Sequence, residues 1–452
     1  MKVTFLGATE TVTGSKYFLE HAGQNILIDC GLFQGHKALR LRNWEPPLVD
    51  PRKLDAILLT HAHLDHSGYI PRMVRNGFDG PIFCSEATFD LCKILLPDSG
   101  HIQEEDAERA NRYGYTKHAS ALPLYTEEEA RRCFGYFRPV SFGQPHALGG
   151  GLSFVLHRAG HILGASFIRI SDGQTTILFS GDIGRLHNPV MKPPAKIQEA
   201  DYLVLESTYG DRLHDKDDPA EDIGRIVRET IAKGGTVIMP AFAVGRAQEI
   251  LYYLYTLKSE KRIPDIPVYL DSPMAINATD LLHKHMDDHR LSPEECEDVC
   301  RVATYLHTAE DSRSLNSSVM PKIIISASGM ATGGRVLHHL KNYLGDARST
   351  ILFAGYQAPG TRGDRLVSGE KEIKIHGQMW AVRARIENLH NVSAHADYAE
   401  ILTWLESFRS APRKVFITHG EPVAAESLRR KIEEKFGWHA IVPAYAQSET
   451  LS

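Results

Sequence analysis

The sequence predicts an α/β protein in which an inserted domain interrupts a domain built from two β-rich layers flanked by helices. Short β-rich runs fill the first 207 residues, and alternating strand and helix patterns follow them. The β-rich pattern returns from residue 373. We therefore expect one domain in two parts, 1–207 and 373–452, around an inserted domain at 208–372.

The first part opens with three β-rich runs, KVTFLG, KYFLEH and NILIDCG, which are typical of a strand meander. The apolar run DAILLT then leads into a polar turn and a helix. Residues 88–137 are expected to be mostly helical and polar. Further strands are predicted at PIFCS, LSFVLHRAG, FIRIS, TTILFSGD and DYLVLEST.

The inserted domain has a different order of elements, because each apolar strand pattern is followed by a helical one. TVIMP leads into AVGRAQEILYYLYTL, and KIIISAS leads into GMATGGRVLHHLKNYL. PVYLDS and TILFAGY add two more strands. This alternation predicts a parallel α/β sheet. After residue 373, the runs KIHGQMWAVRARIENL, SAHAD, TWLESFR and KVFITHGEP resemble the first part.

Composition limits the class of function. With 452 residues, 42% hydrophobic and 24% charged, the chain is an ordinary folded protein. Its 51 basic and 56 acidic residues give a net charge of −5, so bulk charge does not favour nucleic-acid binding. No run approaches the roughly 18 apolar residues that a membrane span needs, and MKVTFLGATE is unlike a signal peptide. We expect a cytoplasmic protein without a membrane partner.

The six cysteines, at 30, 84, 92, 133, 296 and 300, are too scattered for a disulfide framework, and none forms a CxxC pair. Reduced thiols in the cytosol fit this pattern. Cys296 and Cys300 are four residues apart and could share a helix face. Because the nearest candidate metal motif is far away in sequence, we interpret this pair as structural.

The strongest local signal is a cluster of metal-capable side chains directly after an apolar strand: His61, His63, Asp65 and His66 in HAHLDH. A tight loop at a strand end can bring all four to one point. Imidazole and carboxylate suit Zn²⁺, with bonds of about 2.0–2.2 Å. The spacing differs from the helical HExxH pattern, since no Glu lies between the histidines.

A single loop cannot complete two metal shells, so further ligands are expected at other strand ends. His161 follows LSFVLHRAG, Asp182 ends TTILFSGD and His419 ends KVFITHG. Each lies where an apolar strand changes to polar residues. Together with the loop at 61–66, they predict one metal centre.

These residues give the chain a resemblance to the metallo-β-lactamase superfamily, whose signature is an HxHxDH loop with later His, Asp and His. The resemblance implies an αββα sandwich and two Zn²⁺ ions per chain. His61, His63 and His161 would hold one ion, Asp65, His66 and His419 the other, and Asp182 would bridge them. Asp29 in LIDCG matches an early Asp that orients the ligating histidines from behind.

Three motifs also resemble the β-CASP group, the branch of the superfamily that processes nucleic acids. They are Glu206 in ESTYG, His395 in SAHAD and His419 in THGE. In that group a histidine at the third motif is typical of members acting on RNA, whereas DNA-repair members usually carry valine. The resemblance therefore implies an RNA substrate.

The resemblance also implies a mechanism in which hydroxide formed at two zinc ions attacks phosphorus. His395 would donate a proton to the departing 3′ oxygen while Glu206 orients its ring. We count Asp65 with Glu206 and His395 as catalytic. The products would carry a 5′-phosphate and a 3′-hydroxyl. Endonucleolytic and 5′–3′ exonucleolytic modes stay open, because they share this chemistry.

RNA contacts are expected in the inserted domain at strand-to-helix turns, where small residues and helix N-termini can meet phosphate. SGMATGGR is neither a Walker loop nor GxGxxG, so a nucleotide cofactor is not expected. The candidate RNA-binding residues, which resemble β-CASP counterparts, are Arg246, Ser328, Thr332, Arg335, Arg362 and His376.

Two other readings remain. A small-molecule hydrolase acting on lactams or thioesters would share the metal motif but not the three β-CASP motifs. A non-catalytic scaffold subunit of an RNA-processing complex would have lost metal ligands, whereas every ligand position here is filled. The resemblance allows a homodimer, although the sequence carries no independent dimer signal.

Overall fold

The computed structural model describes residues 1–114, 120–215, 217–355, 357–358, 360–389 and 391–452, and these residues form two compact units. Unit 1 comprises Met1–His187, Pro193–Leu213 and His395–Ser452. Unit 2 comprises Asn188–Lys192 and His214–Ala394. An inserted unit therefore interrupts unit 1, but the chain returns to unit 1 at His395 rather than at the expected residue 373.

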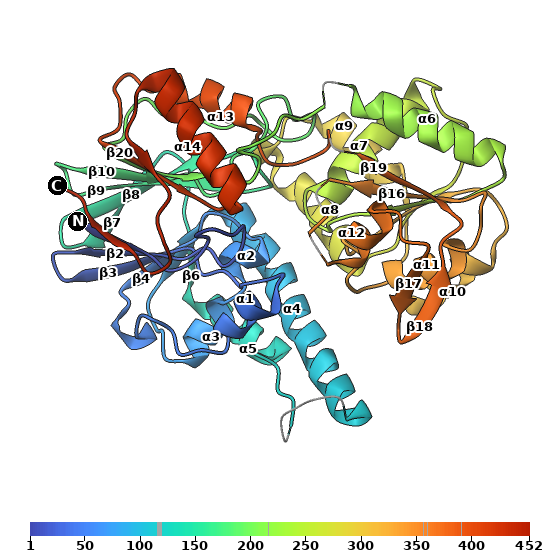
Figure 1. Cartoon of the computed structure of the whole chain (residues 1–452), viewed down its shortest axis with the longest axis horizontal. Helices are drawn as coiled ribbons and strands as arrows, with labels where there is room; N and C mark the ends of the chain where they lie inside the picture. Colours follow the sequence, from blue (N-terminus) through green and yellow to red (C-terminus); the bar gives the residue numbers. More distant parts are fainter. Residues whose placement is uncertain (115–119, 216, 356, 359, 390) are drawn as a thin grey trace. The chain divides into compact units, whose positions relative to one another are not determined.

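Unit 1 contains two mixed sheets (Figure 1). Within the described residues, the first sheet has the order β22 (Ser448–Thr450), β1 (Lys2–Phe5), β2 (Tyr17–His21), β3 (Gln24–Ile28), β4 (Ala56–Leu58), β5 (Ile82–Cys84), β6 (Phe137–Pro139). The second has the order β21 (Ala440–Ile441), β20 (Lys414–Thr418), β11 (Tyr202–Glu206), β10 (Thr176–Phe179), β9 (Ser166–Ser171), β8 (Leu152–Arg158), β7 (Pro145–Gly149).

The core of unit 1 lies between these two sheets. Alternate residues of the strands are buried, as in β8, because successive side chains of a strand point to opposite faces. Phe5 of the first sheet meets Phe416 of the second at 5.0 Å between ring centroids, and Phe83 meets Phe154 at 5.2 Å. Burying each of these side chains stabilises the fold by about 1.5–3 kcal/mol.

Helices cover the outer faces of the sandwich (Figure 1). The helices beside the first sheet are α1 (Lys37–Arg42), η1 (Pro51–Lys53), α2 (Leu64–Ser67), α3 (Ile70–Arg75), α4 (Glu86–Tyr113), α5 (Glu127–Arg132) and η2 (Cys133–Tyr136). Those beside the second sheet are α13 (Tyr398–Leu405) and α14 (Pro422–Phe436). The αββα sandwich predicted for this unit is confirmed.

Unit 2 is built on a parallel sheet, as the alternating pattern predicted. Within the described residues the strand order is β14 (Thr304–Tyr305), β13 (Val268–Leu270), β15 (Ile323–Ser326), β12 (Val237–Pro240), β16 (Thr350–Ala354), β19 (Arg385–Leu389). Its central strands are entirely buried, which is typical of parallel strands covered on both faces. The register pairs Val237 with Ile323 and Ile238 with Ile351.

The helices of unit 2 lie before and between its strands along the chain. They are α6 (Pro219–Ala232), α7 (Arg246–Ser259), α8 (Pro273–Lys284), η3 (Met286–Asp288), α9 (Pro293–Arg301), α10 (Ala309–Ser317), α11 (Val336–Tyr343) and α12 (Arg362–Val367).

Residues 373–394 belong to unit 2, which corrects the boundary expected from the sequence. The hairpin of β17 (Glu372–Ile375) and β18 (Gln378–Ala381) buries Ile373 and Ile375 in the core of that unit. β19 then pairs in parallel with β16. The segment is β-rich, as the sequence predicts, but β17 and β18 pair with each other and β19 pairs with β16 of unit 2.

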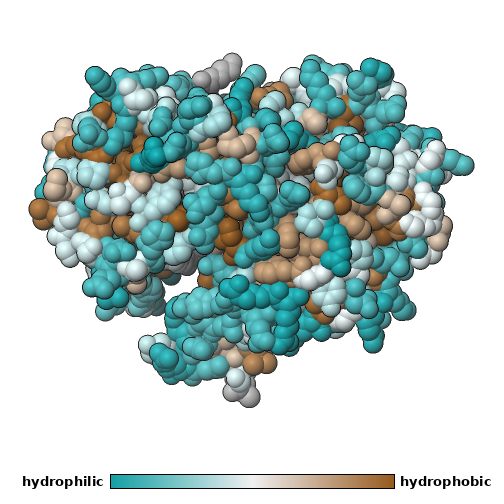
Figure 2. Space-filling model, turned by 180° about the vertical axis from the view of Figure 1, so that it is seen from behind, coloured by the Kyte–Doolittle hydropathy of each residue, from teal (hydrophilic) through white to brown (hydrophobic). Residues whose placement is uncertain are grey.

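Figure 2 shows one face, on which apolar side chains form scattered patches among hydrophilic ones. Val319 and Val423 are examples of strongly exposed apolar residues. Among the described residues, the helices lack any stretch long and apolar enough to span a membrane.

Candidate metal centre

The loop at 61–66 leaves the first sheet directly after β4. The three residues of β4 are buried, and the backbone N–H of Thr60 donates a hydrogen bond of 2.8 Å to Asp29 Oδ1. α2 starts at Leu64, with His63 as its N-cap residue. This short strand–loop–helix turn directs the side chains of the loop to one point, as the sequence predicted.

A first group of donors forms around His63. Its Nδ1 lies 3.2 Å from His61 Nε2 and 3.2 Å from His161 Nε2. Asp182 Oδ2 lies 3.4 Å from each of these Nε2 atoms. His161 comes from the loop after β8 and Asp182 from the loop after β10, so three separate strand ends supply the group.

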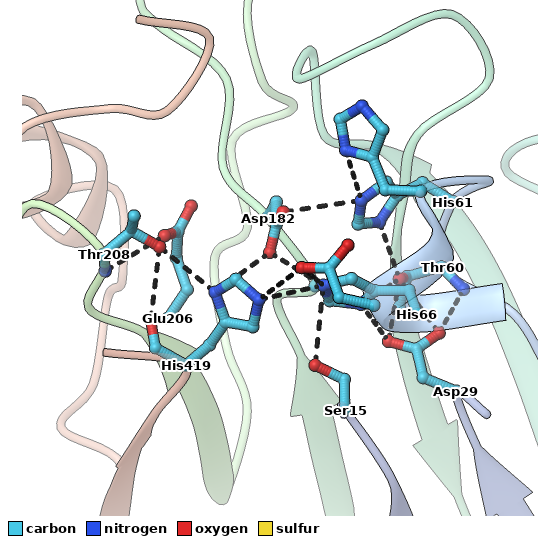
Figure 3. Close-up of polar contacts among 12 residues, drawn as sticks. Ser15, Asp29, Thr60, His61, His66, Asp182, Glu206, Thr208 and His419 are labelled. Atoms are coloured by element: carbon cyan, nitrogen blue, oxygen red, sulfur yellow. Dashed lines mark hydrogen bonds and ion pairs between the residues drawn. The ribbon is translucent and has the colours of Figure 1, made fainter. Parts of the chain in front are cut away.

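A second group contains Asp65, His66 and His419. His66 Nε2 lies 3.1 Å from His419 Nε2, which is 3.3 Å from Asp65 Oδ2. Asp182 Oδ1 lies 3.2 Å from His66 Nε2. Figure 3 shows the Asp182 carboxylate beside His61, His66 and His419. One oxygen of Asp182 therefore faces each group.

These donors fit zinc chemically. Imidazoles and carboxylates are preferred Zn²⁺ ligands, and bonds of about 2.0–2.1 Å at tetrahedral angles would hold two nitrogens about 3.3 Å apart. The observed spacing of 3.2 Å around His63 is close to that value. Asp182 Oδ1 is buried and accepts no hydrogen bond from the described residues. The imidazole nitrogens near Oδ1 make no well-aligned hydrogen bond to it, and a buried carboxylate oxygen is costly unless a donor or a cation satisfies it.

The protonation states of the first group and of Asp182 also suit metal binding, whereas burial lowers the pKa of His66 but Asp182 and Asp29 outweigh it and raise that pKa well above its usual value. Burial lowers the pKa of His61 to about 3 and that of His63 to about 4, and it lowers the pKa of His161 well below its usual value. Burial raises the pKa of Asp182, but the surrounding imidazoles, His419 and His66 foremost, outweigh it and hold that pKa well below the usual range. Neutral imidazoles and an ionised carboxylate are the forms that bind metal.

Hydrogen bonds behind the ligands fix the orientation of their rings. Asp29 Oδ2 accepts from His66 Nδ1 at 2.7 Å, which is the supporting place predicted for Asp29. Thr60 Oγ1 lies 3.1 Å from His61 Nδ1, and Thr208 Oγ1 lies 3.1 Å from His419 Nδ1. Each contact leaves the Nε2 atom directed into the cluster.

Sequence reasoning did not single out Thr60 and Thr208. The available signal was their position: Thr60 directly precedes the HAHLDH loop, and Thr208 lies within ESTYG. A hydroxyl next to a ligand motif can accept from a histidine Nδ1, but only the structure shows which hydroxyl faces which ring.

His395 and Glu206 form a hydrogen-bonded pair beside the two donor groups. His395 Nδ1 lies 3.1 Å from both carboxylate oxygens of Glu206, and its Nε2 lies 3.9 Å from Asp182 Oδ2. Burial lowers the pKa of His395, but Glu206 and Asp182 outweigh it and raise the pKa to about 9. An imidazolium held by a carboxylate, with its other nitrogen directed at the cluster, can act as a proton donor.

Local backbone contacts explain how His395 and His419 reach the site. Ala396 N–H donates to Ile183 O at 2.8 Å, and a capping box between Asp397 and Glu400 starts α13 immediately afterwards. His419 has φ 50°, in the left-handed region, and its N–H donates to Ala8 O at 2.7 Å. Such a backbone in a non-glycine residue is strained and is concentrated at functional sites.

The three arginines expected to contact RNA all have partners within unit 2. Arg246 is buried and forms an ion pair with Glu249. Arg335 donates to Asp271 Oδ1 at 2.7 Å and to two backbone carbonyls. Arg362 donates to the carbonyls of residues 331, 332 and 374. The contacts of these guanidinium groups therefore stabilise the local structure of unit 2.

The remaining candidates lie on turns of the same unit. Ser328 Oγ accepts from Thr332 N–H at 3.0 Å and lies 3.0 Å from Thr332 Oγ1, which closes the SGMATGGR turn. His376 has φ 48° at the tip of the β17–β18 hairpin, and its ring faces His338 at 5.3 Å between centroids.

Comparison with known proteins places the chain in a family. Residues 11–219 match the metallo-beta-lactamase superfamily, residues 247–366 a Beta-Casp domain, and residues 380–443 a Zn-dependent metallo-hydrolase RNA specificity domain. The chain belongs to the metallo-beta-lactamase superfamily, among its members with a Beta-Casp domain. Membership confirms the predicted class, a zinc-dependent hydrolase that acts on RNA.

Among its relatives is a protein of Thermus thermophilus named Ribonuclease TTHA0252, which is 36% identical over 93% of both chains. A transcription termination factor, FttA, of Methanocaldococcus jannaschii is 29% identical over 98% of this chain and 70% of its own length. A crystal structure of an Enterococcus faecalis protein of unknown function matches the whole chain and 99% of its own, with a TM-score of 0.57 and 16% identity. That last likeness concerns the fold alone.

Proposed function

We propose that the protein is a ribonuclease that hydrolyses RNA phosphodiester bonds with two zinc ions per chain. The observation that carries the proposal is the position of Asp182, whose two oxygens face two separate groups of buried donors. The identity with a named ribonuclease across 93% of both chains supports RNA as the substrate. Endonucleolytic and 5′–3′ exonucleolytic cleavage are both compatible with this centre.

In this proposal the two donor groups divide the ligands. His61, His63 and His161 would hold one ion; Asp65, His66 and His419 would hold the other; and Asp182 would be shared. What the two ions supply when bound is Lewis acidity, which favours ionisation of a water molecule and offsets charge on the phosphodiester. Asp29, Thr60 and Thr208 keep the rings in place.

His395 and Glu206 complete the reaction on the leaving-group side. Hydroxide attacks phosphorus, the bond from phosphorus to the 3′ oxygen breaks, and His395 Nε2 gives its proton to that oxygen. Glu206 keeps His395 protonated and oriented through its contact with Nδ1. The products carry a 5′-phosphate and a 3′-hydroxyl.

RNA contacts are proposed at turns of unit 2. Ser328, Thr332 and His376 supply polar groups that can meet the phosphate backbone. Arg246, Arg335 and Arg362 contribute by stabilising the local structure of unit 2, because each is engaged by an acceptor of the same unit. A cytoplasmic location stays a prediction from composition and cysteine usage, and a homodimer stays a prediction from the resemblance.

A test compares cleavage of end-labelled RNA by the wild type and by His63→Ala, with His157→Ala as the matched control. His157 lies on β8, four residues before His161, and is not part of either donor group. We expect near-complete loss of activity and of bound zinc in His63→Ala only. Equal cleavage by both variants would contradict the proposal. RNAs with a 5′-phosphate, with a 5′-hydroxyl and in circular form distinguish the modes of cleavage.

A further inference from the structure

A second cluster of metal-capable side chains lies in unit 2, between α8 and α9. Cys296 and Cys300 occupy successive turns on one face of α9, and Cys296 Sγ lies 3.7 Å from Nδ1 of His283 near the end of α8. The ligand atoms of all three residues lie within 4.8 Å of one another. The cysteine pair that the sequence left as structural thus acquires a third donor from another helix.

The three side chains of the cluster differ in their exposure to solvent. Cys296 is fully buried, Cys300 is half-buried and His283 is exposed. Hydrogen bonds from Cys300 and then from His289 lower the pKa of the Cys296 thiol. His289 is itself fixed, since its Nε2 lies 2.9 Å from Leu282 O and its Nδ1 accepts from Leu291 N–H at 3.3 Å. Cys296 therefore lies in surroundings that favour a thiolate, whereas the contact with Cys296 and burial raise the pKa of the Cys300 thiol, whose proton a metal ion would displace.

The cysteines of unit 1 show how unusual this environment is within the chain. Cys84, Cys92 and Cys133 are buried near one another, and burial raises the pKa of all three thiols. Such cysteines behave as small apolar side chains. Residue type alone therefore does not account for the depressed pKa of Cys296.

We propose that Cys296, Cys300 and His283 form a binding site for a single Zn²⁺ ion, separate from the ligands of the catalytic centre. Two thiolates and one imidazole are a preferred zinc donor set, with a water molecule as the fourth ligand at the exposed side. Bonds of about 2.3 Å to sulfur and about 2.0–2.1 Å to nitrogen would place these atoms about 3.6 Å apart. The observed separation of 3.7 Å is already close to that distance.

A disulfide between Cys296 and Cys300 fits the geometry of α9 less well than a shared metal ion does. Residues four apart on a helix have Cβ atoms about 5–6 Å from one another, whereas a disulfide needs about 3.5–4.5 Å. A capping box between Ser292 and Glu295 fixes the first turn of α9, so the helix does not readily unwind to close that gap. A metal ion bridges the longer distance without moving the backbone.

The bound ion would join α8 to α9 across the connection that contains η3. Because the site takes one ligand from α8 and two from α9, binding favours the packed arrangement of both helices over the unfolded one. The role assigned to this zinc is therefore structural, and it is independent of RNA cleavage.

Cobalt(II) provides a specific readout, because a thiolate bound to Co²⁺ gives an intense charge-transfer absorption in the near ultraviolet. The ligands of the catalytic centre are nitrogen and oxygen atoms, so they do not contribute to this band. We expect the metal-free full-length protein to develop the band on titration with Co²⁺. Zn²⁺ should abolish it by displacement and raise the melting temperature.

Variants distinguish the site from a chance contact. Cys296→Ser and Cys300→Ser should lose the band, and His283→Ala should weaken Co²⁺ binding at least about tenfold. Because His283 is exposed, its replacement leaves the fold intact. Cys133→Ala removes a buried thiol elsewhere and should keep the band. Absence of the band in the wild type, or its persistence in Cys296→Ser, overturns the proposal and indicates an S–H···N contact only.

Discussion

Two buried carboxylates, Asp182 in unit 1 and Asp271 in unit 2, look alike in sequence and differ in what surrounds them. Each follows a strand, β10 or β13, and each faces histidine. Asp271 accepts from Arg335 Nη1 at 2.7 Å, His339 Nε2 at 2.7 Å and Ser312 Oγ at 2.5 Å. Asp182 is surrounded by imidazoles, yet its Oδ1 accepts no hydrogen bond from the described residues.

The difference separates a structural carboxylate from one suited to a metal. A buried charge is tolerated where donors satisfy each of its oxygens, and Asp271 meets that condition. Asp182 does not, and the nitrogens around it are spaced as zinc ligands would be. The unsatisfied oxygen, rather than the mere presence of histidines, therefore marks the functional site.

The largest effect is expected for Asp182→Asn. Replacing one carboxylate oxygen by an amide NH₂ removes the negative charge that both donor groups share. Because the loss of one electrostatic partner at an active site already costs about 10²–10³-fold, we expect kcat to fall by roughly 10⁴-fold or more. Cleavage of labelled RNA and zinc content by mass spectrometry measure the change.

The control for Asp182→Asn is Asp271→Asn, which alters an equally buried carboxylate in the other unit. The comparison predicts that zinc at the catalytic centre stays at the wild-type level in Asp271→Asn. A loss of catalytic zinc in both variants, or in neither, would contradict the distinction between the two carboxylates.

Glu206→Gln should have the next largest effect, since Glu206 acts on His395 rather than on the donor groups. General acid catalysis contributes typically about 10²–10⁴-fold, so we expect kcat on RNA to fall by roughly 10²-fold. Zinc content should stay unchanged. An activated substrate such as bis(p-nitrophenyl) phosphate has a leaving group that needs no proton, and its hydrolysis should be nearly unaffected. An equal loss on both substrates would show that Glu206 is needed for more than proton donation.

Much of the catalytic centre could be predicted from the sequence, because its ligands lie at visible changes from apolar to polar residues. His61, Asp182 and His419 each follow a buried strand, and the structure brings them together. Strand ends are local features. The meeting of several strand ends at one edge then follows from the topology of the sandwich.

What could not be predicted depends on partners that are distant in sequence. The pairing of Arg335 with Asp271, 64 residues away, is one example. The β19 segment was assigned to unit 1, but its partner is β16. Cys296 meets His283 only because α8 and α9 pack together. In each case the local sequence pattern predicts the secondary structure and exposure of a residue, whereas tertiary packing determines which residue it contacts.

Asp271→Asn is expected to lower stability and to leave the chemistry intact. The variant removes the negative charge from a site where Arg335 and His339 stay buried or half-buried. Hydrogen bonds to charged groups contribute about 1.5–3 kcal/mol, so we expect the free energy of unfolding to fall by about 2–3 kcal/mol. Urea unfolding followed by circular dichroism measures the loss. Ser312→Ala, which removes a neutral donor to the same carboxylate, should cost less.

The pH dependence of this loss identifies its origin. Burial raises the pKa of Asp271, but hydrogen bonds from His339, Ser312 and Arg335 outweigh it and hold the pKa below its usual value. A carboxyl group whose pKa is lower in the folded than in the unfolded state stabilises the fold above the unfolded pKa, near 4, and loses that contribution as the pH falls through the folded value. The difference in unfolding free energy between wild type and Asp271→Asn should therefore shrink as the pH falls below about 4. A difference that stays the same throughout the acid range would assign the cost to altered packing instead of the lost charge.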